Sequence, residues 1–346
     1  MINQTGIIDL IKISHYASNN KGYIQGGGGN TSVKLDDQMM AVKASGCKLS
    51  QIDYFDGYVI VDYKSIREYF AKADSKNPNF HNESEKELQL SIRPHEGLKE
   101  LRPSVEAGFH SLLKKYVIHT HSVYSNILCC SKEGKSICEK IFEDMNFIWL
   151  PYIDPGAKLT LVIKNAIDRN GSIPDAIFMQ NHGVIVTADD SDEVIKIHED
   201  INTRIRTYFE LPQEFPNVLI EEFKEDQGQV IHFKSASPFL KVYFEKNLKE
   251  LEILREKVLY PDQLVYLNNS IYKKDGSRSD IQFIDGTIVY TTSYTQAEVN
   301  EETLVAYLFV TQMIKEKNLT LVSLNYEQQA FILGWESESY RKSMLK

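Results

Sequence analysis

The sequence lacks both a long apolar run and a basic leader. None of its 346 residues belongs to a stretch of about 18 apolar residues, the length that a membrane-crossing helix needs. The N-terminal stretch MINQTGIIDLIKIS has no Lys or Arg before its apolar part, so it does not have the pattern of a signal peptide. These absences predict a cytoplasmic protein with no membrane partner.

Cysteine is scarce, and its spacing is uninformative for metal binding. The chain has four cysteines, and no two of them form a CxxC pair. Cys129 and Cys130 are adjacent, which does not suit the disulfide framework of a small secreted protein. We expect reduced thiols that fill the core.

Positive charge is in deficit, and nucleotide-binding fingerprints are missing. The 39 Lys and Arg face 48 Asp and Glu, which gives a net charge of −9. Nucleic-acid binders gain affinity when Lys and Arg neutralise phosphates, so this balance argues against that class. After Gly26 and Gly28 a dinucleotide-binding loop requires glycine at the position of Thr31, and no GxxxxGK[ST] sequence occurs.

What the chain has is the composition of an ordinary globular protein. It is 42% hydrophobic and 25% charged, which allows a sizeable core. Its length exceeds that of one domain of about 150 residues. The regular pattern breaks around Pro212 and Pro216. We therefore predict a main domain at 1–215 and a smaller α/β unit at 220–346, for which no motif indicates a chemistry.

Hydrophobic periodicity predicts a mixed α/β layout for both units. In the main domain, helices are expected at 4–20, 103–114, 132–144, 157–169 and 191–209, strands at 31–35, 39–43, 115–121, 147–152, 176–179 and 183–187, and an exposed loop with at most one helical turn at 71–100. In the smaller unit, helices are expected at 238–257, 296–316 and 326–341, strands at 263–267, 281–285, 287–292 and 319–324, and a turn at Asp285-Gly286.

Three histidines are spaced as metal ligands. His119 and His121 lie two apart on an expected strand, so their side chains point to the same face. His182 stands between two expected strands, where Gly183 would let the backbone bend inward. Three neutral imidazoles suit Zn²⁺ and leave a position open for substrate. An HxH pair alone is more often two ordinary histidines at a strand end.

A carboxylate and a glycine run stand near these histidines in the sequence. Glu106 falls two residues into the helix before the HxH strand, and a short turn would bring it to the metal, although a helix N-terminus by itself also favours a carboxylate. The glycines at 26–29 free backbone N–H groups to approach an anion, with Asn30 and Ser45 beside them. The alternative is a flexible surface turn. Lys43 alternates along the strand toward Ser45 and could supply charge, but the default interpretation is a solvated lysine.

Four motifs, in this order and at these separations, resemble the class II aldolase/adducin family. They cover about residues 1–212 and are GGGGNTS at 26–32 with VKASG at 42–46, RPSVE at 102–106, VIHTHS at 117–122 and QNHGVI at 180–185. The glycine loop and the extended C-terminal part look closest to the aldolase half of rhamnulose-1-phosphate aldolase/alcohol dehydrogenase fusions, without a dehydrogenase half. The segments 260–263 and 334–338 fit this resemblance more loosely.

The resemblance implies a layered α/β/α fold with a central, mostly antiparallel sheet and a homo-oligomer with active sites at subunit interfaces. It implies Zn²⁺ or another divalent metal ion on the three histidines, and Glu106 as the acid/base residue, as in fuculose-1-phosphate aldolase. It also implies a binding site for the substrate phosphate, formed by Gly29, Asn30, Ser45, Gly46 and Ser104. Val105 departs from the family's second serine and removes one hydroxyl donor to that phosphate.

The function implied is that of a class II aldolase. Such an enzyme cleaves a ketose 1-phosphate to dihydroxyacetone phosphate and an aldehyde through a metal-stabilised enediolate. A pentulose-phosphate 4-epimerase of the same family would share the ligand set and remains an alternative. A non-catalytic adducin-like binding protein is a third, although it has no chemical need for three histidines and Glu106.

Overall fold

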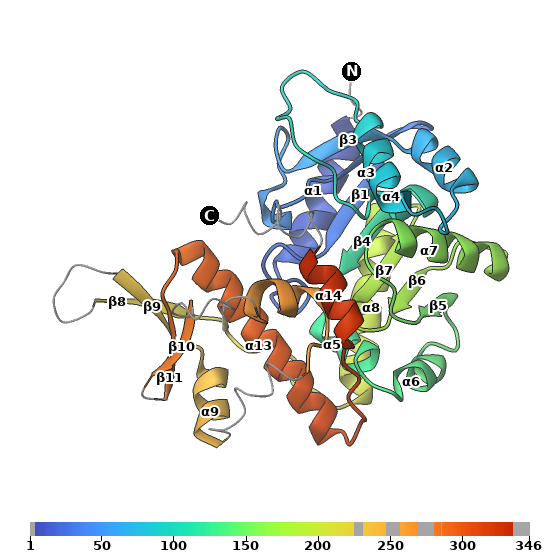
Figure 1. Cartoon of the computed structure of the whole chain (residues 1–346). Coiled ribbons are helices and arrows are strands. Elements are labelled where there is room, and N and C mark those ends of the chain that lie inside the picture. The colour runs from blue at the N-terminus through green and yellow to red at the C-terminus, as the bar shows by residue number, and fades with distance from the viewer. Residues whose placement is uncertain (1–3, 225–230, 247–256, 269–279, 285, 335–346) are drawn as a thin grey trace.

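The computed structural model describes residues 4–224, 231–246, 257–268, 280–284 and 286–334 (Figure 1). Its centre is a seven-stranded sheet with the order β3-β2-β1-β4-β7-β6-β5. Every neighbouring pair is antiparallel except β5 and β6. The strands are β1 Asn30–Lys34, β2 Met39–Lys43, β3 Tyr58–Asp62, β4 Tyr116–Thr120, β5 Phe147–Leu150, β6 Ala176–Met179 and β7 Gly183–Ala188.

Successive residues of a strand point to opposite faces of the sheet, and in this sheet both sets include apolar side chains. Helices therefore cover both faces. On one face Ile118 packs with side chains of α1, α5 and α8. On the other, Val117 packs with α4 and α7, while α2 and α3 cover the β1-β2-β3 end. The helices are α1 Gln4–Ser18, α2 Tyr63–Lys72, α3 Phe80–Leu90, α4 Ala107–Leu112, α5 Val123–Cys129, α6 Gly134–Ile141, α7 Ala157–Asn170 and α8 Ser191–Tyr208. The expected layered α/β/α fold is confirmed.

The C-terminal part forms a second sheet and a long helix. The sheet has the order β10-β11-β9-β8. Helix α13 contacts this sheet and packs against α5, and its buried side chains join the same core cluster as α1, α5 and α8 (Figure 1). The elements are β8 Ile220–Lys224, β9 Ile231–Ser235, α9 Pro238–Lys246, α11 Pro261–Gln263, a π-helical turn at Leu264–Asn268, β10 Ile281–Ile284, β11 Thr287–Tyr290, α13 Tyr294–Glu316 and α14 Tyr326–Gly334.

Several expected elements are wrong. The segment 263–267 is helical rather than a strand, and at 319–324 only Leu321 pairs, in an isolated bridge with Ser131. The expected loop at 71–100 contains α3, and the helix expected from 103 begins at Ala107. β3, α2, α5, β8 and β9 were not predicted. The expected ends of two helices, at 247–256 and 335–341, and Asp285 lie outside the described residues, as do 335–338 of the loosely matching segment.

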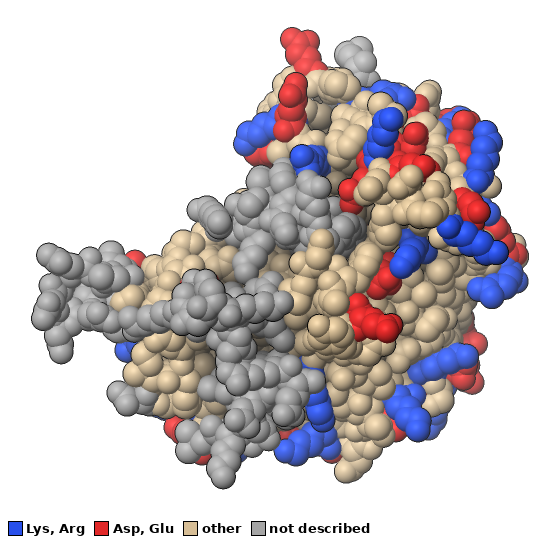
Figure 2. Space-filling model, in the orientation of Figure 1, with Lys and Arg blue, Asp and Glu red and all other residues tan. Residues whose placement is uncertain are grey.

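The surface drawn in Figure 2 carries charge of both signs, and the cysteines are free thiols. On the face drawn in Figure 2, Lys and Arg side chains alternate with Asp and Glu, and no basic stripe crosses its described part. All four cysteines are free, and three of them, Cys129, Cys130 and Cys138, are buried. Among the described helices, none is long and apolar enough to cross a membrane.

Candidate metal centre

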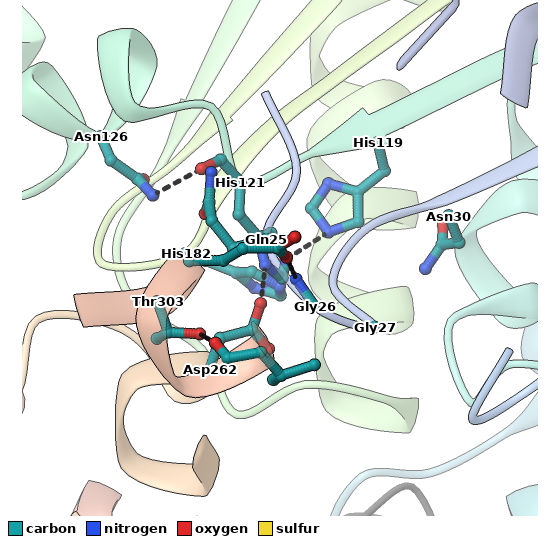
Figure 3. Close-up of polar contacts among 12 residues, drawn as sticks. Gln25, Gly26, Gly27, Asn30, His119, His121, Asn126, His182, Asp262 and Thr303 are labelled. Atoms are coloured by element: carbon teal, nitrogen blue, oxygen red, sulfur yellow. Dashed lines mark hydrogen bonds and ion pairs between the residues drawn. The ribbon is translucent and has the colours of Figure 1, made fainter. Parts of the chain in front are cut away.

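His119 and His121 meet at the end of β4. His119 lies on the strand and His121 just beyond it, and their Nε2 atoms are 3.2 Å apart. His182 comes from the turn between β6 and β7, the strand that pairs with β4. One ring nitrogen from each of the three buried imidazoles lies within 4.8 Å of the others (Figure 3). The three histidines singled out from the sequence are therefore brought together.

The turn that carries His182 is not bent by its glycine. Asn181 has a φ of 54°, in the left-handed region, where asparagine is tolerated better than most residues. Its side-chain amide donates to the carbonyl oxygens of Leu259 and Val322. Gly183 is required for a different reason, since a Cβ there would clash with the carbonyl oxygen of Thr120. The expectation that glycine supplies the bend is wrong; glycine instead permits close packing of β7 on β4.

Hydrogen bonds at Nδ1 turn the Nε2 atoms of His119 and His121 toward the centre. The Nδ1 of His119 lies 3.0 Å from the carbonyl oxygen of Val184, which only accepts, so Nδ1 carries the proton. The Nδ1 of His121 lies 2.5 Å from Oδ2 of Asp262. The Asp262 carboxylate accepts a hydrogen bond from this nitrogen, so Nδ1 of His121 also carries the proton. In both rings Nε2 is then left with a lone pair. Burial also lowers the pKa of His119 well below its usual range, which favours the neutral form that binds metal.

This donor set fits a divalent metal ion. Three buried imidazoles converge, and two of them have the tautomer that presents Nε2 as a ligand. Such a set matches a catalytic zinc site with three protein nitrogens and an open position. A structural site would close the fourth position with another cysteine or histidine.

Glu106 faces the histidine cluster. It directly precedes α4 rather than lying two residues inside it, and its side chain makes no capping hydrogen bond. Its Oε1 is 3.3 Å from Nε2 of His182, and its Oε2 is 3.6 Å from Nε2 of His119. The helix-terminus interpretation is thus replaced by a position beside the proposed ligands.

Asn30, on the strand β1 that pairs with β4, makes a hydrogen bond to Glu106. It lies opposite His119 in the β1-β4 register, and its Nδ2 donates to Oε2 of Glu106. Its Oδ1 accepts from Nε2 of His110, whose Nδ1 in turn accepts from Ser32. Burial lowers the pKa of His110 to about 3, so this relay is neutral. The amide of Asn30 is therefore engaged with Glu106, a role that sequence reasoning missed.

A pocket joins these groups to the expected anion-binding residues. Lys43, expected to be solvated, is 3% exposed, and its Nζ donates to the carbonyl oxygen of Gly27 at 3.3 Å. That expectation is wrong, and the pocket holds a cationic side chain. The lining consists of Gly27, Gly29, Asn30, Lys43, Ser45, Gly46, Ser104, Val105, Glu106, His121, Pro155, His182, Pro261 and Asp262. All five residues proposed for the substrate phosphate are among them.

Comparison with known proteins points to one family. The family model described as "Class II Aldolase and Adducin N-terminal domain" matches residues 9–209. The structure of the N-terminal class II aldolase domain of a conserved protein from Thermoplasma acidophilum is 25% identical, with a TM-score of 0.50, over 58% of this chain and 92% of that chain.

Two curated relatives are similar over about half of the chain. A 3-oxo-tetronate 4-phosphate decarboxylase of Haemophilus influenzae is 24% identical over 206 residues, which is 55% of this chain and 81% of the relative. An uncharacterized oxidoreductase of Bacillus subtilis is 27% identical over 198 residues, or 54% of this chain. The chain spans only 27% of that oxidoreductase's length.

Proposed function

Because the chain belongs to the class II aldolase and adducin family, we propose that it is a metal-dependent aldolase. It cleaves a ketose 1-phosphate to dihydroxyacetone phosphate and an aldehyde. The observation that carries this proposal is one pocket lined by His121, His182, the Glu106 carboxylate and the expected anion-binding residues, with His119 completing the histidine cluster beside it. Retro-aldol cleavage needs the metal ligands, the carboxylate and the anion site, because it leaves a negative charge on a phosphorylated fragment and moves a proton.

His119, His121 and His182 hold the metal ion in this proposal. When bound, a divalent ion acts as a Lewis acid that stabilises the negative charge of the enediolate. Glu106 lies within 3.6 Å of two of these imidazoles, so its carboxylate is placed to move a proton on a substrate held at the metal site. In cleavage it returns a proton to C3 of the enediolate, and in condensation it removes that proton.

The anion end of the pocket supports a phosphorylated substrate. Lys43 offers a positive charge, and Ser45 and Ser104 offer hydroxyl groups. Gly29 and Gly46 have φ values of 62° and 82°, which leave their backbone unshielded by a side chain. The charge of Lys43 offsets the hydroxyl donor that Val105 removes.

Decarboxylation is a second candidate, favoured by the similarity to a 3-oxo-tetronate 4-phosphate decarboxylase. Loss of CO₂ from a 3-oxo acid that carries a 2-hydroxyl group leaves the same kind of enediolate, and the same Glu106 would protonate it. The epimerase alternative also passes through retro-aldol cleavage but releases no fragment. The three activities therefore differ in product and not in the groups required.

The test is metal analysis of protein purified without chelators, joined to a product screen. We expect about one divalent ion per chain and release of dihydroxyacetone phosphate from a ketose 1-phosphate. Release of CO₂ from 3-oxo acid phosphates would show that the activity is decarboxylation rather than aldol cleavage. Epimerisation without fragment release would show that the protein is an epimerase. If the wild-type protein had neither metal nor turnover, the result would favour an adducin-like binding protein. The homo-oligomer remains a prediction, which light scattering tests.

A further inference from the structure

Asp262 reaches the metal centre from outside the part of the chain that matches the family. It follows His121 by 141 residues and lies beyond the matched residues 9–209. Its side chain is 1% exposed, and its Oδ2 is 2.5 Å from Nδ1 of His121 (Figure 3). The C-terminal part thus places a buried carboxylate on the outer nitrogen of one proposed metal ligand.

We propose that Asp262 is a positioning residue for His121, so that the C-terminal part completes the metal centre. The inference rests on the proposed function, in which His121 binds a divalent ion through Nε2. A carboxylate that accepts a hydrogen bond from Nδ1 fixes the imidazole in the tautomer with a free Nε2, orients the ring and makes Nε2 more basic. All three effects strengthen metal binding.

Hydrogen bonds of the neighbouring residue fix the segment that carries Asp262. Gln263, the next residue, accepts a hydrogen bond from the backbone of Leu259 and donates one to the carbonyl oxygen of Lys257. On the other side, Gly28 leaves room for the pair, since a Cβ there would clash with Oδ2 of Asp262 and lie 2.9 Å from Nδ1 of His121. The glycine run therefore makes space for this pair as well as facing the pocket.

The three imidazoles differ in how their outer nitrogens are supported. Nδ1 of His119 donates to a backbone carbonyl, and Nδ1 of His182 has no hydrogen-bond partner among the described residues. His121 alone of the three has a carboxylate there. We therefore expect replacement of Asp262 to weaken metal binding even though the three ligands remain.

The experiment measures the zinc dissociation constant of the full chain by competition with a chelating dye. For Asp262→Ala we expect affinity about 10 to 100 times weaker than for the wild type. For Asp262→Asn, whose amide oxygen still accepts from Nδ1 but carries no charge, we expect a loss of about fivefold. Glu301→Ala is the matched control, because Glu301 is another buried carboxylate of the C-terminal part, bonded to Ser235 and Tyr290 and not to a histidine. Its zinc affinity should stay within about twofold of the wild type.

Two results would overturn the inference. One is wild-type zinc affinity in Asp262→Ala or, if that variant does not fold, in Asp262→Asn. The other is an equal loss in Glu301→Ala, which would assign the effect to general packing of the C-terminal part. A wild-type protein that binds zinc but cleaves no sugar phosphate would overturn the aldolase proposal and leave this inference standing; a wild type that binds no divalent ion would remove both.

Discussion

The Glu106 carboxylate lies between two imidazoles and the Asn30 amide, and the three histidines provide enough ligands without it. Glu106→Gln should therefore keep the metal ion and lower kcat by about 10²- to 10⁴-fold, because the group that moves the proton is lost. Metal content and exchange of the C3 proton of dihydroxyacetone phosphate should be measured in one sample. Exchange at the wild-type rate in metal-replete variant protein would remove Glu106 from the role of acid and base.

Ser45 and Asn30 line the same pocket but should fail differently. Ser45→Ala removes a hydroxyl donor to an anion, so KM for a phosphorylated substrate should rise about tenfold or more, with little change for the unphosphorylated analogue. Asn30→Ala releases Glu106, so kcat should fall for both substrates. Steady-state kinetics with matched substrate pairs separates the two. Equal effects of Ser45→Ala on both substrates would contradict a phosphate site at Ser45.

His198 makes the fold sensitive to acid. Its ring is buried between Tyr16 and Thr120, and burial lowers its pKa to about 4, against about 6.5 in the unfolded chain. Between about pH 6.5 and pH 4, His198 is therefore protonated in the unfolded state but neutral in the folded state. This group should cost about 2 kcal/mol of unfolding free energy at pH 5, an effect absent at pH 7 and above.

Urea unfolding of the wild type and of His198→Gln at pH 7 and pH 5 checks this pH dependence. The variant should be less stable at pH 7, because it loses buried hydrogen bonds, but its stability should fall less between pH 7 and pH 5. An equal fall in both proteins would mean that other groups cause the acid sensitivity.

At the scale of elements, the turn between β6 and β7 depends on Asn181. Asn181→Gly keeps the left-handed backbone free of strain and loses the bonds to Leu259 and Val322. Asn181→Ala loses the same bonds and adds a backbone cost of about 1 kcal/mol. Chemical denaturation should thus show that the alanine variant is less stable than the glycine variant. At most other positions the glycine variant is the less stable of the two. Equal stability would show that the turn relaxes to another backbone conformation.

Local patterns carried the prediction of elements near the site. The strands of the β1-β2 hairpin were expected because their residues are β-branched or alternate around a turn dipeptide, and β6 and β7 were expected from hydrophobic periodicity. The same logic made 263–267 a strand, since a short apolar run fits either a strand or a buried helix until tertiary packing decides. Helix α5 was missed because all seven of its residues are buried, which leaves no polar face to mark its period.

In the site, too, local sequence patterns predicted some residues, and contacts between distant positions were missed. His119, His121 and His182 were found from spacing and motif, and the structure brings their side chains together. Asp262 and the Asn30–Glu106 bond were not found, because each joins positions far apart in the sequence: His121 and Asp262 are separated by 141 residues. No local pattern records such a contact.

At the scale of the whole molecule, the proposed division into 1–215 and 220–346 does not separate two cores. Tyr124 of α5 packs edge-on against Phe309 of α13, and both belong to one cluster that continues under the main sheet. Glu302 of α13 accepts a hydrogen bond from the backbone N–H of Gly26, so the helix also holds the glycine run. We expect the two parts to unfold together.

Hydrogen exchange in increasing urea, followed by mass spectrometry, tests this coupling. Peptides from β7 and from α13 should lose protection at the same denaturant concentration, because exposing α13 also exposes the face of α5. Loss of protection in α13 at a distinctly lower concentration would mean that the C-terminal part opens on its own.

The separation of His121 from Asp262 also has a consequence in time. A ribosome that adds about 5 to 20 residues per second needs roughly 7 to 30 s to make the 141 residues between them. During that interval the nascent chain already contains His121, but the carboxylate that fixes its ring does not yet exist. Tight metal capture should therefore belong to the late stages of synthesis, when α11 has emerged and docked.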